Sequence, residues 1–507
     1  MKLEKKFSAE LEELRFQIEG HARDYGLDFF PVIFEILDYR KLNEVAAQSG
    51  FPNRYPHWKF GMDYEQLSKG YSYGLQKIYE LVINNNPCYA YLLESNEIVD
   101  QKLVMAHVFG HCDFFKNNFW FSKTNRKMMD EMANYGSRVR RYIDFHGEDT
   151  VEEFIDVCLS IEDLIDPYSP FIKREEDKKN PFLKKTNEDE ENVKLLDSKG
   201  GYMGDYLNPP EFVRRQREKI KEKKEEKKRK EIELIKVNEG DRDILKFLVE
   251  YSPLEDWQRD ILSIIRNESY YFAPQKQTKI MNEGWASYWH SKIMTEKALI
   301  DSELTEYSKH HAGTMGRQPG IINPYKLGLE LFLDIEDRWN KGKFGEEYEN
   351  CKDAVQRKNW DKKLGLGRDK IFEVRRVYND CGFIDAFLTE DFCRENDFFV
   401  YSYDKKNRQY AISNRDFIDI KKNFIFSLTN FGKPAISLKD ANHDNKGELL
   451  LIHEHPKRNL RKDYADDTLK NLFKIWKKPV NLETTNSENE KIIINCSQDG
   501  VSIKNIT

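Results

Sequence analysis

Apolar residues recur three and four positions apart through most of the first 390 residues of the chain. This spacing places them on one face of an α-helix. Asn323 before Pro324 is typical of a helix cap followed by the first helical turn. The helix predictions include residues 8–48, 64–75, 97–115, 150–163, 278–298 and 324–340, with one short strand at 88–93. These residues therefore predict a large helical N-terminal domain.

The pattern changes at about residue 391, where apolar and polar residues begin to alternate. Alternation with a period of two predicts β-strands. The strand predictions are residues 398–403, 409–413, 418–428, 435–438, 448–454 and 492–496, and residues 465–476 predict one helix. The fold class is therefore mainly α, with a smaller C-terminal α+β module.

The sequence predicts that the chain is organised in four parts. They are a first helical part at 1–195, a charged linker at 196–240, a second helical part at 241–390 and the α+β module at 391–507. Residues 214–231 are almost purely charged and lack an apolar stripe, which is typical of a solvated helix or linker. An RNA-associated or ribosome-associated role is the alternative for this segment.

Composition narrows the function classes. The chain has 507 residues, a mean hydropathy of -0.77 and a formal net charge of -6, so no overall field attracts nucleic acid or an anionic membrane. No apolar stretch approaches the roughly 20 residues that span a bilayer. The N-terminus lacks an apolar signal core, and we expect a cytoplasmic protein. The seven cysteines contain no CxxC pair, which argues against a disulfide framework or a cysteine-based zinc site.

His107 and His111 are the first candidate metal ligands. They are four residues apart on a predicted helix, so their side chains lie on one face and can share an ion. The apolar run 103–106 indicates that this helix is buried, where imidazoles need partners. The alternative is a pair of core histidines bonded to carboxylates. Zinc peptidases of the HExxH type have a glutamate after the first histidine, but here that residue is Val108.

Glu283 is the candidate third ligand, on a second predicted helix. Gly284 follows it and allows another helix to pack closely. His290 lies two helical turns further on, roughly 10 Å away by helical rise, so we expect it to support the site or to act as an acid or base. The alternative is a plain helix crossing in which Trp285 and Trp289 fill the core.

Other residues are candidates for chemistry around such a site. Glu268 stands among aromatic residues, and burial would raise its pKa into the range useful for a general base. A surface or salt-bridged glutamate is the alternative reading. Asp113, Ser287 and His311 are candidates for supporting the ligands or contacting substrate.

Six segments together resemble the stage V sporulation protein R family. They are AHVFGHCDFFKNNF (106–119), MNEGWASYWH (281–290), INPYKLG (322–328), VRRVYNDCGFIDAFLTEDF (374–392), IHEHPKRNL (452–460) and LFKIWKKPV (472–480). The resemblance implies a link to formation of the spore cortex, a modified peptidoglycan. In bacteria that do not sporulate, it implies a role in stress physiology alongside serine-kinase-like and von Willebrand-type proteins. It implies no settled catalytic activity.

The leading functional hypothesis is a metal-dependent hydrolase, similar to an amidase or peptidase, with a zincin-like helical site. His107, His111 and Glu283 would hold Zn²⁺ or another divalent metal ion, and Glu268 or His290 would accept a proton. A peptide or a peptidoglycan-related molecule would be the substrate. One alternative is a non-enzymatic scaffold that binds a serine-kinase-like partner, and another is an RNA-associated factor, although nucleic acid is not an expected partner.

Overall fold

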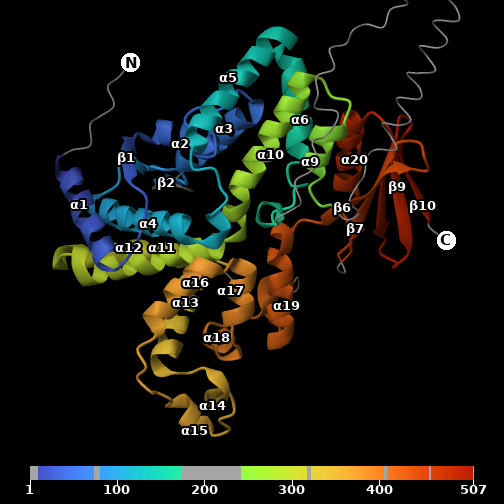
Figure 1. Ribbon diagram of the computed structural model, residues 1–507. Helices are drawn as coiled ribbons and strands as arrows, with labels where there is room; N and C mark the ends of the chain where they lie inside the picture. The colour runs from blue at the N-terminus through green and yellow to red at the C-terminus, as the bar shows by residue number, and fades with distance from the viewer. Residues whose placement is uncertain are drawn as a thin grey trace, which may run out of the picture. The chain divides into compact units, whose positions relative to one another are not determined.

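The chain is mostly helical and folds into two compact units (Figure 1). The computed structural model describes residues 9–72, 80–172, 241–316, 321–404, 408–455 and 458–505. The first unit comprises Met1–Leu159 and Asp256–Lys433, and the second comprises Ser160–Glu255 and Pro434–Thr507. The charged linker predicted at 196–240, with its segment 214–231, lies outside the described residues.

A small sheet with flanking helices begins the first unit. Its elements are α1 (Ala9–Asp24), β1 (Val32–Leu37), α2 (Tyr39–Ala47), α3 (Trp58–Ser72), β2 (Glu80–Ile83) and β3 (Cys88–Leu93). The strand order is β1-β3-β2, with β1 parallel and β2 antiparallel to β3. The strand predicted at 88–93 is confirmed. The helix predicted over 8–48 is wrong at residues 32–37, because this β-branched run pairs with β3 along its whole length.

Helices form most of the rest of the first unit. They include α4 (Ile98–Asn117), α5 (Met128–His146), α6 (Glu148–Ser160), α10 (Asp256–Gln277), α11 (Lys279–Ile293), α12 (Leu304–Thr314), α13 (Pro324–Lys341), α16 (Gly367–Val377), α17 (Asp380–Phe387) and α18 (Glu390–Glu395). The helices predicted at 97–115, 278–298 and 324–340 are confirmed, with a π-helical turn completing the second. Almost every residue of α4 from Val99 to Phe115 is buried, so this helix lies at the centre of the unit.

Glycines allow three of these helices to pack closely. A Cβ on Gly110 of α4 would lie 2.7 Å from Ala286 Cα of α11. A Cβ on Gly284 would lie 2.3 Å from the backbone carbon of Gly328 in α13. Contacts this short are possible only without a side chain. The first holds α4 beside α11, as Figure 1 also shows, and the second holds α13 beside α11.

A buried carboxyl group caps the N-terminus of α11. Asp380, at the start of α17, accepts hydrogen bonds of 2.9 Å from the backbone N–H groups of Ile280 and Met281. These groups lie in the first helical turn, where no intrahelical acceptor is available. Burial raises the pKa of Asp380 to about 7, although both hydrogen bonds oppose this shift.

The first unit ends with a hairpin and a helix. The hairpin joins β4 (Val400–Asp404) to β5 (Gln409–Asn414), and α19 (Phe417–Leu428) follows. The strand predicted at 418–428 is therefore wrong. Asp416 caps α19 by accepting from Asp419 N, and Ile420 and Phe424 bury one helical face in the core of the first unit.

The second unit contains a mixed five-stranded sheet. Its elements are α9 (Ile244–Tyr251), β6 (Ala435–His443), β7 (Glu448–Glu454), α20 (Lys462–Trp476), β8 (Val480–Thr485), β9 (Lys491–Ser497) and β10 (Gly500–Asn505). The order is β10-β9-β8-β7-β6, and α20 connects the parallel strands β7 and β8. Strands predicted at 435–438, 448–454 and 492–496 and the helix at 465–476 are confirmed, whereas β8 and β10 were not predicted.

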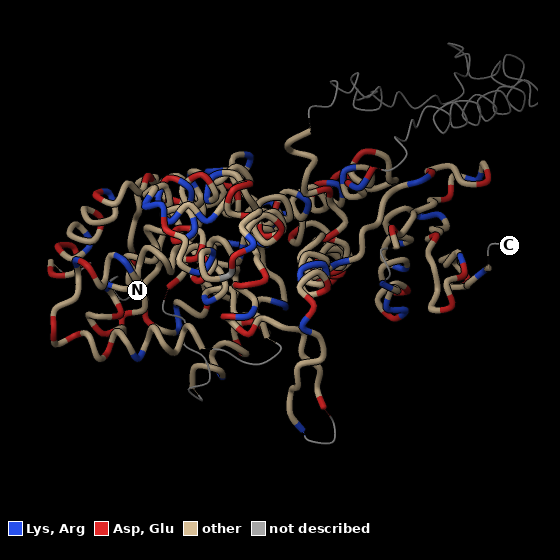
Figure 2. The backbone as a smooth tube through the Cα atoms, turned by 90° about the horizontal axis from the view of Figure 1, so that it is seen from below, with Lys and Arg blue, Asp and Glu red and all other residues tan. Residues whose placement is uncertain are grey.

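The sheet occupies only part of the range 391–507 assigned to the C-terminal module, because β4, β5 and α19 belong to the first unit. Among the described helices, none has both the length and the apolar character needed to cross a bilayer. Lysines and arginines are interspersed with aspartates and glutamates along the described backbone, as Figure 2 shows. The small net charge of -6 is therefore not the sum of one large basic and one large acidic region in the described residues.

We expect Gly284→Ala to lower the free energy of unfolding by about 1–3 kcal/mol, because its methyl group would force α11 and α13 apart. Gly20→Ala is the matched control, since a Cβ there meets nothing within 4 Å inside α1. It should leave stability unchanged or raise it by up to about 1 kcal/mol. Urea unfolding measures both, and equal effects would contradict the close crossing.

Asp380 should make the stability of the protein depend on pH. Its pKa rises from 3.8 to about 7 on folding, so its contribution is full below about pH 4 and is lost as the pH rises through 7. At about 1.4 kcal/mol per pKa unit, the loss is at most about 4 kcal/mol. The unfolding free energy of the wild type should therefore fall relative to Asp380→Asn between pH 4 and pH 8. Parallel curves for the two proteins would contradict this assignment.

Candidate metal centre

His107, His111 and Glu283 converge between α4 and α11. His107 Nε2 lies 3.6 Å and His111 Nε2 lies 3.5 Å from Glu283 Oε2. Each of the three side chains offers a ligand atom, and these atoms lie within 4.8 Å of one another. The two imidazole rings are nearly perpendicular, with centroids 4.5 Å apart. The structure thus brings together the three residues predicted as metal ligands.

The geometry fits a small divalent ion. Zinc bonds to nitrogen and oxygen are about 2.1 Å long, and a tetrahedron of that size has edges of about 3.4 Å. The two nitrogen–oxygen separations, 3.5 and 3.6 Å, are close to this edge. Glu283 Oε2 and Ser287 Oγ, one helical turn apart, are buried without a hydrogen-bond partner. Such unsatisfied groups are rare in folded proteins, and a cation beside Glu283 would satisfy its oxygen.

The electrostatics of the cluster favour ligand-competent protonation states. Burial and the neighbouring charge of His107 lower the pKa of His111 to about 4, so its imidazole is neutral near pH 7. Burial alone would raise the pKa of Glu283, but the neighbouring imidazoles of His107 and His111 outweigh it and lower the pKa. A neutral imidazole and an ionised carboxylate are the forms that bind metals.

Asn282 orients His111. Its Oδ1 lies 3.0 Å from His111 Nδ1, and because an amide oxygen only accepts, Nδ1 must carry the proton. The lone pair is then on Nε2, which faces Glu283. The sequence places Asn282 directly before Glu283, but its role depends on how far α11 is rotated against α4, which no local pattern reveals.

Two further histidines extend the cluster away from Glu283. His290, predicted as an acid or base, has its Nδ1 at 2.9 Å from His107 Nδ1. Its Nε2 lies 3.4 Å from Nδ1 of His311, which was predicted to contact substrate or support the site. His310, beside His311 on α12, pairs with the buried Asp100 of α4. The three imidazoles of residues 107, 290 and 311 therefore form a continuous chain.

Sequence reasoning missed two residues beside the ligands. The ring of Tyr325 lies 6.1 Å from that of His107, and its hydroxyl hydrogen-bonds to Glu283. Burial and the charges of Glu283 and Glu80 raise the pKa of Tyr325. Burial also raises the pKa of Glu80, on β2, against the charge of His107. Tyr325 stands in the segment INPYKLG, which is a usable signal, whereas the short strand that begins at Glu80 offers none.

Glu268, predicted as a general base, has different partners. It lies on α10 and forms a buried ion pair with Arg54, and the hydroxyl of Tyr55 lies 3.3 Å from the same carboxylate. Arg54 and Glu268 are 6% and 5% exposed, so the two charges need each other for stability. Val108, which follows His107 where zinc peptidases have their glutamate, is fully buried among apolar side chains. The likeness to zincins stays a prediction.

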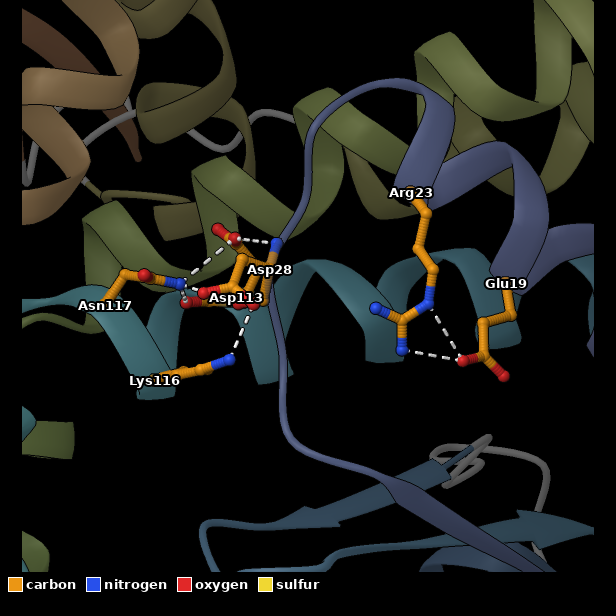
Figure 3. A network of polar contacts seen from close by, with 6 residues as sticks. All are labelled: Glu19, Arg23, Asp28, Asp113, Lys116 and Asn117. Atoms are coloured by element: carbon orange, nitrogen blue, oxygen red, sulfur yellow. Dashed lines mark hydrogen bonds and ion pairs between the residues drawn. The ribbon is translucent and has the colours of Figure 1, made fainter.

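Asp113 joins α4 to its surroundings one half-turn beyond His111. It accepts hydrogen bonds of 2.8 Å from Trp285 Nε1 and from the backbone N–H of Asp28, and Arg375 Nε lies 3.4 Å away. Burial raises its pKa to about 6, against the charge of Arg375. Figure 3 shows Asp113 between Asp28 and Asn117. Asp113 therefore fixes α4 against α11 rather than touching the ligands directly.

The fold and the site define a mainly helical protein with a His-His-Glu cluster whose candidate ligand atoms lie within 4.8 Å of one another. The family model described as SpoVR like protein matches residues 5–433, so the chain belongs to the SpoVR family. The match confirms the resemblance read from the sequence, although the segments at 452–460 and 472–480 lie beyond it.

One curated relative is similar over nearly the whole chain. It is the Escherichia coli (strain K12) protein named "Uncharacterized protein YcgB", which is 30% identical over 501 residues. The alignment covers 93% of this chain and 91% of the relative, so it includes the second unit. No solved structure matches the chain.

Glu268→Ala should lower the free energy of unfolding by about 3–5 kcal/mol, because Arg54 would keep a buried charge without its carboxylate. Glu65→Ala is the matched control. It removes an ion pair with Lys69 whose side chains are more than 60% exposed, and it should change stability by less than about 0.5 kcal/mol. Chemical denaturation measures both, and a small loss for Glu268→Ala would leave Glu268 free to serve as a base.

Proposed function

We propose that the chain binds one divalent metal ion through His107, His111 and Glu283 and uses it to hydrolyse an amide bond. The observation that carries the proposal is the convergence of these side chains, from segments about 170 positions apart, at tetrahedral spacing. The buried Oε2 of Glu283, without a hydrogen-bond partner, supports it independently.

A bound divalent ion of this kind acts as a Lewis acid and lowers the pKa of water at its open coordination position. The protein residues keep the site ready for such an ion. Asn282 holds His111 with Nε2 free, and Tyr325 orients Glu283 by a hydrogen bond. Of the two predicted proton acceptors, Glu268 is paired with Arg54 and His290 is hydrogen-bonded to His107, so neither is free to take a proton from a bound water in this arrangement.

The substrate class follows from the family resemblance and the site chemistry together. Two imidazoles and one carboxylate leave a coordination position open, as in hydrolytic zinc sites. The link between the family and the spore cortex suggests the peptide amide bonds of a peptidoglycan-related molecule. A scaffold that binds a serine-kinase-like partner is the alternative function, in which the histidines serve packing alone.

Metal analysis tests the site. We expect the purified full-length protein to retain about one equivalent of Zn²⁺ after dialysis, and the double variant His107→Ala/His111→Ala to retain none. His443→Ala/His455→Ala is the matched control. It removes two histidines of the second unit and should keep the metal. Stoichiometric metal in the His107→Ala/His111→Ala protein would end the proposal.

Hydrolysis is tested separately with the metal-loaded protein. Amine release from peptidoglycan-derived peptides should depend on Zn²⁺ and should be lost in Glu283→Gln. If the protein binds zinc but cleaves none of these peptides, the hydrolase proposal fails for this substrate class while the metal site stands. Capture of a serine-kinase-like protein that survives in Glu283→Gln would then favour the scaffold.

A further inference from the structure

A chain of three imidazoles leads away from the proposed metal ligands. His107 Nδ1 and His290 Nδ1 are 2.9 Å apart, and His290 Nε2 and His311 Nδ1 are 3.4 Å apart. The first contact is a well-formed hydrogen bond, and the second lies at the long end of the range. His107 and His290 are 4% and 2% exposed, so water is largely excluded from the first link.

The direction of these hydrogen bonds matters for metal binding. A neutral imidazole carries one proton, and its other nitrogen is the acceptor or the metal ligand. If His290 donates to His107, the proton of His107 must lie on Nε2, facing Glu283. If His107 donates to His290, its Nε2 has a free lone pair at the metal position. In the first direction His107 Nε2 is protonated and cannot bind a metal ion, and in the second it can. We call these the closed and the open tautomer of His107.

We infer that His290 and His311 are positioning residues that hold His107 in the tautomer presenting Nε2 to the metal. The inference rests on the proposed function. In this arrangement His107 Nδ1–H donates to His290 Nδ1, and His290 Nε2–H then donates to His311 Nδ1. Metal-bound histidines usually donate their second ring nitrogen to a protein acceptor, which fixes the tautomer and raises ligand basicity.

The geometry around His290 suits an acceptor. Its two ring nitrogens face different histidines, because Nδ1 lies 2.9 Å from His107 Nδ1 and Nε2 lies 3.4 Å from His311 Nδ1. If Nε2 carries the proton and donates to His311, Nδ1 keeps the lone pair that accepts from His107.

Helix α12 holds the outer end of the chain in place. The ring of His311 stacks on Tyr307, one helical turn earlier, with centroids 5.6 Å apart. His310 fastens the same helix to α4 by pairing with Asp100. At the end of the helix, Asn323 Nδ2 donates to the carbonyl of Thr314 at 2.8 Å. The position of α12 is thus linked to the tautomer of a proposed ligand two imidazoles away.

Zinc affinity of the full-length protein, measured by competition with a chromophoric chelator, tests the inference. His290→Asn should bind Zn²⁺ within about threefold of the wild type, because the amide oxygen can accept from His107 Nδ1–H. His290→Leu has no acceptor and should bind about 10–100-fold more weakly. Equal losses in the two variants would overturn the inference, since they would show that His290 acts through packing alone.

A double-mutant comparison tests the second link. His311→Leu should weaken zinc binding in the wild type. It should have no effect in His290→Asn, because residue 290 then has no ring nitrogen that could hydrogen-bond to His311 on α12. Lys309→Ala, on an exposed position of the same helix, should change nothing in either background. The same loss from His311→Leu in both backgrounds would overturn the chain. This comparison also carries the test if His290→Leu fails to fold.

The outcomes separate the inference from the proposed function. A wild-type protein that binds no zinc would remove the proposed metal site, and the positioning role would fall with it. Zinc binding that is lost in His107→Ala/His111→Ala but is equal in His290→Asn and His290→Leu would keep the metal site and overturn only the positioning role.

Discussion

Close contact between α4, α11 and α13 is the constraint on which the first unit depends. Gly110 against Ala286, and Gly284 against Gly328, bring helix backbones within a distance that any side chain would prevent. Because α4 is buried almost throughout, the groups it turns towards α11 cannot reach bulk water. The packing that stabilises the core therefore also forces polar side chains of the two helices to satisfy one another.

Those polar groups are satisfied in two different ways along the same helix pair. At one end, Asp113 accepts from Trp285 and lies beside Arg375, so every partner is supplied by the protein. Further along, His107, His111 and Glu283 meet with ring nitrogens and a carboxylate oxygen 3.5 to 3.6 Å apart, too far for good hydrogen bonds. The network around Asp113, whose partners all come from the protein, and the proposed metal site therefore lie along the same helix, α4.

Local patterns in the sequence predict those features of the site that depend on a single helix. The spacing of His107 and His111 on one helical face needs no tertiary information, and Gly284 indicated a close crossing. Residues 32–37 are predicted as helix but form a strand, because they pair with β3. Residues 418–428 are predicted as a strand but form a helix, because one helical face packs into the core around Phe424. Glu80 and Tyr325 join the site only through the packing of β2 and α13, which no spacing along the chain encodes.

The absence of a glutamate after His107 has a structural reason. Position 108 points into the apolar core, where Val108 is fully buried, so a carboxylate there would face hydrocarbon and not a substrate. Under the proposed hydrolase function, an acid–base group must then come from another element, and Glu80 on β2 is a candidate. Burial raises the pKa of the Glu80 carboxyl, which is the direction that general acid–base catalysis requires.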